Sequence, residues 1–201
     1  MKMNLPNKIT ISRIILSIIL MVFLLIPWYN LGIKMPEFLI HGEVWNIKYI
    51  IAGVVFLIAS LTDYVDGKIA RSRNMVTDFG KVADAIADKI LVNALLIILA
   101  YERIIPILIP VVIITRDTIV DSCKMISGNK GKVVAASFMG KAKTMCMMIG
   151  LTLTLFANFP FIYVNIPIDK ILLIIAMILS IISGCQYYYN SREFLFPKDE
   201  K

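Results

Sequence analysis

Residues 63–88 read DYVDGKIARSRNMVTDFGKVADAIAD, and this stretch decides the fold. Asp63 and Asp66 are three residues apart at the polar end of one apolar segment, and Asp84 and Asp88 are four residues apart at the polar start of the next. On helices, both spacings place a pair of side chains on one face. The short polar stretch between the two segments can reverse the chain. The sequence therefore predicts a helical hairpin in which four carboxylates converge.

Such a cluster of carboxylates needs neutralisation. Two like charges about 4 Å apart repel by about 4 kcal/mol at an effective dielectric constant of about 20. Protonation of one or two members would reduce this repulsion. An all-oxygen site of this size more naturally holds hard divalent cations such as Mg²⁺, Mn²⁺ or Ca²⁺. Two such ions, about 3.5 to 4 Å apart, form the clamp used in phosphoryl chemistry.

Small residues accompany the aspartates. Gly67 and Ala70 follow the first pair of aspartates, and Gly80 precedes the second pair by one helical turn. A helix face without side-chain bulk lets a ligand approach the backbone. Arg71 adds a cation whose planar guanidinium can bind phosphate. We therefore expect a phosphate-bearing ligand beside the carboxylates.

The whole pattern, Asp-x-x-Asp-Gly-x-x-Ala-Arg, eight residues and then Gly-x-x-x-Asp-x-x-x-Asp, resembles the signature of the CDP-alcohol phosphotransferases. These are integral membrane enzymes of phospholipid synthesis. The resemblance implies transfer of a phosphatidyl group from CDP-diacylglycerol to an alcohol, with release of CMP. It also implies two divalent ions, Mg²⁺ or Mn²⁺, and a homodimer.

The same resemblance assigns roles by position. The metal ligands would be Asp63, Asp66, Asp84 and Asp88. The CDP-binding residues would be Asp63, Gly67, Ala70, Arg71 and Gly80. Asp88 would also be the base that takes a proton from the acceptor hydroxyl. General chemistry agrees that a carboxylate near the metals can activate the nucleophile, but it leaves open which of the four does so.

Composition points to one membrane domain over residues 1–201. The chain is 59% hydrophobic, which is more than an ordinary soluble domain of this length contains. Its net charge of +7 fits anionic lipid or an anionic substrate, and the hydropathy argues against nucleic acid. The three cysteines are isolated and have no metal-type spacing.

Hydropathy predicts an all-α integral membrane protein with six transmembrane helices and a short N-terminal interfacial helix. The expected spans cover about residues 14–26, 47–61 with a helical extension to 71, 80–100, 104–125, 140–158 and 168–189. Residues 29–46 contain two glycines and a proline between aromatic side chains, and we expect a loop there.

Six spans would place both termini, the aspartate hairpin and a lysine-rich loop on one side. That side would hold all of the 21 Lys and Arg residues except Lys34, Lys48, Arg103 and Lys170. Positive charge is concentrated in cytoplasmic loops of membrane proteins. The aspartate site is therefore expected at the cytoplasmic face of the cell membrane.

Three further cations indicate a phosphorylated acceptor. Arg116 interrupts the fourth span, and an ionisable residue inside a span is a functional candidate because its exposure to lipid is costly. Lys141 and Lys143 open the fifth span. We interpret these three residues as ligands of an acceptor phosphate, which favours glycerol 3-phosphate. Two structural readings stay open: Arg116 can pair with Asp117 or Asp121 to fix helix packing, and the lysines can serve only as a topology signal.

Two phrases, Asn4 through Arg13 and Gly140-Lys-x-Lys-Thr144, are similar to the bacterial branch of the same family that synthesises phosphatidylglycerophosphate. The chain departs from that branch around Asp84, which has alanines on both sides, and between Asp121 and Lys124. Inositol phosphate is therefore the rival acceptor.

Two more remote functions also fit part of the pattern. An intramembrane prenyltransferase uses paired aspartates, but its acidic motifs would usually be far apart. A cation transporter with an acidic gate leaves Gly67, Ala70 and Arg71 unexplained.

Overall fold

The computed structural model describes residues 5–72, 77–129 and 137–195. Within these ranges the α-helices are α1 (Leu5–Leu25), α2 (Ile47–Ser72), α3 (Asp78–Tyr101), α4 (Leu108–Asn129), α5 (Phe138–Leu155) and α6 (Ile168–Leu195). The shorter elements are the 3₁₀ helices η1 (Trp28–Leu31) and η2 (Phe161–Val164) and the strands β1 (Glu37–Ile40) and β2 (Glu43–Asn46). All six predicted helices are present; five begin within four residues of the expected start, and α1 begins nine residues earlier than expected.

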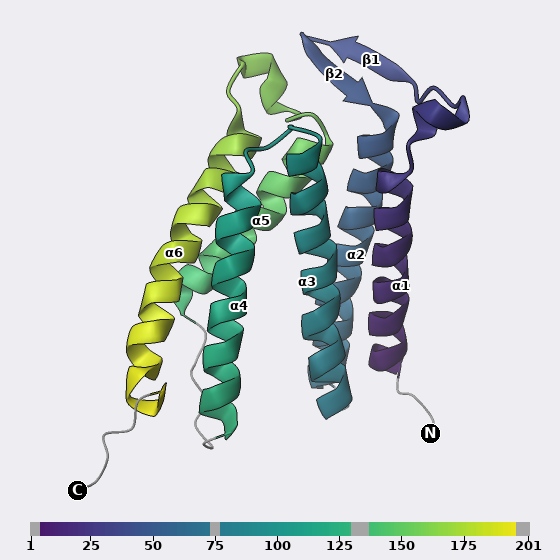
Figure 1. Ribbon diagram of the computed structural model, residues 1–201. Helices are drawn as coiled ribbons and strands as arrows, with labels where there is room; N and C mark the ends of the chain where they lie inside the picture. Colours follow the sequence, from purple (N-terminus) through teal and green to yellow (C-terminus); the bar gives the residue numbers. More distant parts are fainter. Residues whose placement is uncertain (1–4, 73–76, 130–136, 196–201) are drawn as a thin grey trace, which may run out of the picture.

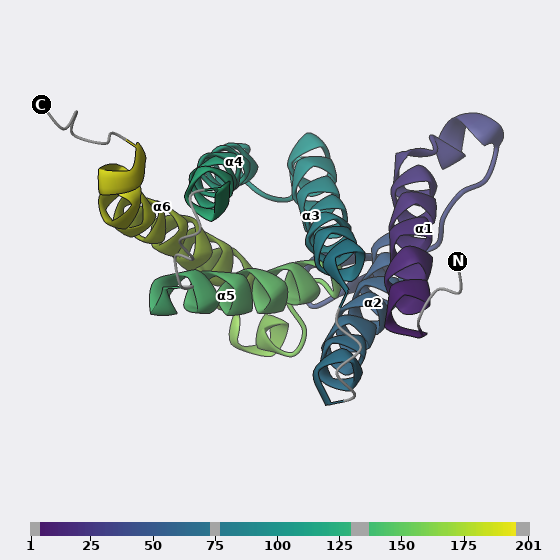
Figure 2. The ribbon, with the colours of Figure 1, turned by 90° about the horizontal axis from the view of Figure 1, so that it is seen from below.

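The helices form two groups. Figure 1 shows the starts of α1 and α3 at one end of the molecule, together with the last turns of α2, α4 and α6, and the β-hairpin at the opposite end. Viewed along the helices, α1, α2 and α3 form one group, and α4, α5 and α6 form the other (Figure 2). Contacts of α2 with α5 and of α3 with α4 join the groups. The aspartate-bearing end of α2 thus lies at the same end as the start of α3.

Each helix buries a stripe of apolar side chains at helical spacing. On α2 the stripe is Ala52, Phe56 and Ala59, and on α3 it includes Leu95 and Leu99. These side chains recur every three to four residues and therefore share one face. The small alanines of α2 let the neighbouring helices pack closely, as is common in membrane bundles.

The outer faces are apolar as well. Ile15, Ile19 and Val22 of α1 are each more than half exposed, and six isoleucines of α6 are exposed at helical spacing. Segments Asn7–Leu25 and Ile168–Arg192 are long and apolar enough to cross a membrane, and most of each segment is not buried within the chain. Length and composition therefore support two spans, and the arrangement of six spans stays a prediction.

Two expectations differ from the structure. The chain is not entirely helical, because strands β1 and β2 pair as an antiparallel hairpin within the expected loop. His41 and Gly42 have φ values of 49° and 85°, which suit a two-residue hairpin turn. The expected separate interfacial helix is also wrong for the described residues, since α1 begins at Leu5 and runs unbroken into the first apolar segment. Pro6 lies in its first turn, where a proline does not interrupt the hydrogen bonding.

Candidate active site

Arg13 joins the two halves of the aspartate motif. This side chain projects from α1 and is 3% exposed. Its Nη1 donates a hydrogen bond to Oδ1 of Asp63 on α2, and its Nη2 donates to Oδ1 of Asp84 on α3. The two carboxylates keep 36% and 50% of their side-chain surface exposed. One buried guanidinium thus brings together two acidic side chains that remain open to a further ligand.

A second contact fixes α1 against the start of α3. Asn7 Nδ2 donates a hydrogen bond to Thr77 Oγ1 at 3.1 Å, and the Thr77 hydroxyl donates to Asn7 Oδ1 at 3.2 Å. Thr77 is also the N-cap of α3, accepting from the Gly80 N–H at 3.0 Å. A Cβ atom at Gly80 would lie 2.7 Å from Asn7 Oδ1. A side chain at position 80 would therefore displace the Asn7 amide from its contact with Thr77, and glycine allows the close approach of α1 to α3.

A cavity of about 600 Å³ lies between the two groups of helices. Asp88 lines it from α3, Arg116 from α4, and Lys141 and Lys143 from α5. Its ionisable lining comprises five cations against three carboxylates: Lys89, Arg116, Lys124, Lys141 and Lys143 against Asp88, Asp117 and Asp121. The residue predicted as the base and the three predicted phosphate ligands therefore line one cavity with an excess of positive charge.

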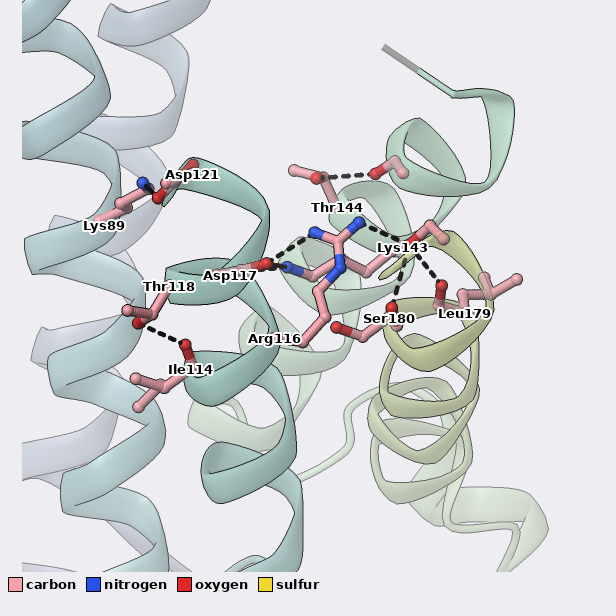
Figure 3. Close-up of polar contacts among 12 residues, drawn as sticks. Lys89, Ile114, Arg116, Asp117, Thr118, Asp121, Lys143, Thr144, Leu179 and Ser180 are labelled. Atoms are coloured by element: carbon pink, nitrogen blue, oxygen red, sulfur yellow. Dashed lines mark hydrogen bonds and ion pairs between the residues drawn. The ribbon is translucent and has the colours of Figure 1, made fainter. Parts of the chain in front are cut away.

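Asp117 neutralises the two most enclosed cations of this cavity (Figure 3). Lys143 is 5% exposed, and its Nζ lies 2.7 and 2.6 Å from the two carboxylate oxygens of Asp117. Arg116 Nη1 donates to Asp117 Oδ1 at 2.8 Å. The ion pair of Arg116 with Asp117 is one of the structural alternatives considered above. Arg116 forms this pair and also lines the cavity. Asp121 pairs with Lys89 across α3 and α4.

Helix α6 holds Arg116 in place through contacts that sequence reasoning missed. Arg116 Nη2 donates to Ser183 Oγ at 2.8 Å, and its Cζ lies 5.8 Å from the ring centroid of Tyr187. A Cβ atom at Gly184 would lie 2.9 Å from Arg116 Cγ. The sequence feature that could have indicated this contact is in α6, where Ser183, Gly184 and Tyr187 interrupt an apolar run.

Four predicted residues lie where α2 is described as backbone only. Asp66, Gly67, Ala70 and Arg71 belong to this helix, but their side chains lie outside the described residues. The convergence of all four aspartates is therefore still a prediction. Among the described side chains, no group of three or more His, Cys, Asp or Glu residues is placed to hold a metal ion. The carboxylate oxygens of Asp63 and Asp84 converge on one cation, the guanidinium of Arg13. Carboxylate oxygens are also the ligands that a hard divalent ion prefers, so these two residues fit such an ion.

Residues 3–182 match the sequence model of the CDP-alcohol phosphatidyltransferase family. The chain belongs to this family. It is 38% identical, over 96% of its own length and 97% of the relative's, to the CDP-diacylglycerol–glycerol-3-phosphate 3-phosphatidyltransferase of Bacillus subtilis. Proteins with the same enzyme name from Rickettsia bellii and Mycoplasma genitalium are 30% and 33% identical. These matches cover 95% and 77% of this chain, and 97% and 66% of the two relatives. The family match includes Arg13, the three described motif aspartates and every predicted cation of the cavity.

Proposed function

We propose that this chain transfers the phosphatidyl group of CDP-diacylglycerol to glycerol 3-phosphate, giving phosphatidylglycerophosphate and CMP. The family membership and the shared enzyme name of its relatives support this reaction. The observation that carries the acceptor assignment is the cavity in which Asp88 lies with Arg116 and Lys143. A small phosphorylated alcohol needs such a pairing of a base with fixed cations.

The donor end of the site is proposed around the aspartates. Asp63, Asp66, Asp84 and Asp88 would hold two divalent ions, Mg²⁺ or Mn²⁺. When bound, these ions would neutralise the diphosphate of the donor and the charge on the departing CMP. The residues proposed to line the nucleotide pocket are Gly67, Ala70, Arg71 and Gly80. Asp84 and Asp88 are one turn apart on α3, so this helix would connect the donor end to the acceptor cavity.

The acceptor end is proposed in the cavity. Arg116 and Lys143 already bind one anion, the carboxylate of Asp117, and their geometry suits the phosphate of glycerol 3-phosphate. Lys141 is exposed at the cavity wall and would add a further charge. Asp88 would remove the proton from the acceptor hydroxyl while the oxygen of that hydroxyl attacks the phosphatidyl phosphorus. The bond from that phosphorus to CMP breaks in the same step.

The proposed setting is a homodimer in the cell membrane, with six spans and the active site at the cytoplasmic face. The distribution of Lys and Arg supports this orientation, because the hairpin end of the molecule contains four of the described cations, Lys34, Lys48, Arg103 and Lys170, out of the 21 Lys and Arg residues of the sequence. The exposed apolar faces of α1 and α6 support contact with lipid.

The experiment that tests this proposal is an acceptor assay. The full chain, purified in detergent, is supplied with CDP-diacylglycerol, Mg²⁺ and either glycerol 3-phosphate, inositol phosphate or no acceptor, and release of CMP is measured. We expect CMP release only with glycerol 3-phosphate. Equal release with inositol phosphate would remove the acceptor assignment, and release without any acceptor would indicate hydrolysis of the donor.

A further inference from the structure

Arg13 occupies an unusual position for an arginine near the start of an apolar helix. Its side chain is 3% exposed, and both of its terminal nitrogens donate to carboxylates of other helices. A buried guanidinium is stable only when its charge is paired, because removing an ion from water is costly. Asp63 and Asp84 supply that pairing. The planar fork of arginine suits two separate carboxylates in a way that the single ammonium of lysine does not.

The helix around Arg13 is held in a fixed place. Asn7 docks α1 on Thr77 and the start of α3. Ser17, which is fully buried, donates from Oγ to the carbonyl oxygen of Arg13 at 2.8 Å. That hydrogen bond is internal to α1, but the burial of Ser17 shows that α1 also packs against its neighbours one turn beyond Arg13. The backbone that carries Arg13 is therefore packed on both sides of this residue.

The charges at this place do not balance. One guanidinium faces two carboxylates, so the group formed by Arg13, Asp63 and Asp84 carries a formal charge of −1. The carboxylates are partly exposed, whereas Arg13 is enclosed. A divalent ion approaching from the exposed side would meet the acidic oxygens with a unit positive charge behind them. Such a charge must weaken binding of the ion.

We propose that Arg13 is the resident counter-cation of the acidic site. It holds Asp63 and Asp84 together when no divalent ion is bound, and it competes with the ion for the same carboxylates. This inference rests on the proposed function of the two aspartates as metal ligands. Arg13 is a positioning residue here: it organises the ligands and lowers metal affinity, so that the metal-free site keeps its geometry.

The proposal predicts opposite signs for two measurements on Arg13→Gln. Binding of Mn²⁺, followed by the loss of its free-ion electron paramagnetic resonance signal, should become about tenfold tighter, the effect of removing a unit charge about 6 Å from a divalent ion in a water-like dielectric. The melting temperature of the protein in EDTA should fall, because the two carboxylates lose their shared cation. Adding Mn²⁺ should restore most of that loss.

Two further variants make the test specific. Lys8→Gln removes one positive charge from an exposed position of the same helix, and it should change neither measurement. Arg13→Lys keeps the charge but loses the fork, so we expect an intermediate stability in EDTA and a Mn²⁺ affinity within about threefold of the wild type.

The outcomes separate this inference from the proposed function. Weaker Mn²⁺ binding by both Arg13 variants would overturn the counter-cation role and make Arg13 a scaffold of the site. An unchanged melting temperature in EDTA would overturn it as well. If the wild-type protein itself bound no Mn²⁺, the proposed metal site would fail first and the role of Arg13 with it. CMP release then decides whether the transferase activity survives.

Discussion

The two charged regions of the molecule have opposite arrangements of cations and carboxylates. Among α1, α2 and α3, one cation, Arg13, is shared by two carboxylates. Among α4, α5 and α6, one carboxylate, Asp117, is shared by two cations. The cluster of Arg13 with its two carboxylates carries a formal charge of −1, and the cluster of Asp117 with its two cations carries a formal charge of +1. Each region therefore keeps the sign that attracts its proposed ligand, divalent ions in one case and a phosphorylated acceptor in the other.

Asp88 lies where the two regions meet, and its replacement is expected to have the largest effect. Asp88→Asn keeps the size of the side chain but removes the base. CMP release should fall by about 10²- to 10⁴-fold, while binding of radiolabelled CDP-diacylglycerol persists. The matched control is Asp121→Asn, which changes another aspartate of the same cavity. Its ion pair with Lys89 is partly exposed, and we expect activity within about threefold of the wild type. Near-normal turnover by the Asp88 variant would remove its assignment as the base.

The second prediction concerns the cations of the cavity. Lys143→Gln should raise the KM for glycerol 3-phosphate by about 10- to 100-fold, as expected for loss of one charge-assisted hydrogen bond to a phosphate. The KM for CDP-diacylglycerol should stay near its original value, because the donor is proposed to bind around the aspartates of the other region. Lys124→Gln is the control, since Lys124 lines the same cavity but is exposed. Equal effects on both KM values would show that the two regions are not separate sites.

The third prediction tests the shared carboxylate. Asp117→Asn leaves the cations Arg116 and Lys143 without their common anion, and the melting temperature should fall by about 5 °C. Glycerol 3-phosphate at saturating concentration should restore stability, because its phosphate supplies the missing charge. Inorganic phosphate should act in the same direction. A loss of stability that neither anion reverses would indicate that Asp117 only fixes the packing of α4 and α5.

The smallest expected effect comes from α6. Gly184→Ala introduces a Cβ atom 2.9 Å from Arg116 Cγ, so the arginine must shift. We expect a rise in the KM for glycerol 3-phosphate of about 3- to 10-fold, with little change in CDP-diacylglycerol binding. Gly128→Ala provides the control, because nothing lies within 4 Å of the added atom. An unaffected KM would show that Arg116 does not depend on α6 for its position.

Local patterns in the sequence were sufficient for the helices and for much of the cavity. Asp84 and Asp88 are one turn apart, and Arg116 adjoins Asp117 in the chain, so their proximity follows from helix geometry. Apolar runs of about 20 residues likewise define the six helices. The hairpin was missed because strands β1 and β2 are only four residues long and the expected loop contains the same glycine that makes the turn.

Contacts between distant segments could not be read from the sequence. In the sequence Arg13 stands out only as the end of the phrase that begins at Asn4, since its partners on α2 and α3 are far along the chain. The support of Arg116 by Ser183 depends in the same way on how α6 packs against α4. Spacing within one helix indicates which side chains share a face, but it does not indicate which other helix that face meets.

The contact between Asn7 and Gly80 has an evolutionary consequence. The amide of Asn7 fills the space that a side chain at position 80 would need, so the two positions form one steric unit. A larger residue at position 80 would require the Asn7 amide to move or to be replaced by a smaller side chain. Randomising both positions together should therefore yield stably folded combinations, such as alanine at 80 with glycine or alanine at 7, that are rarer when position 80 is varied alone.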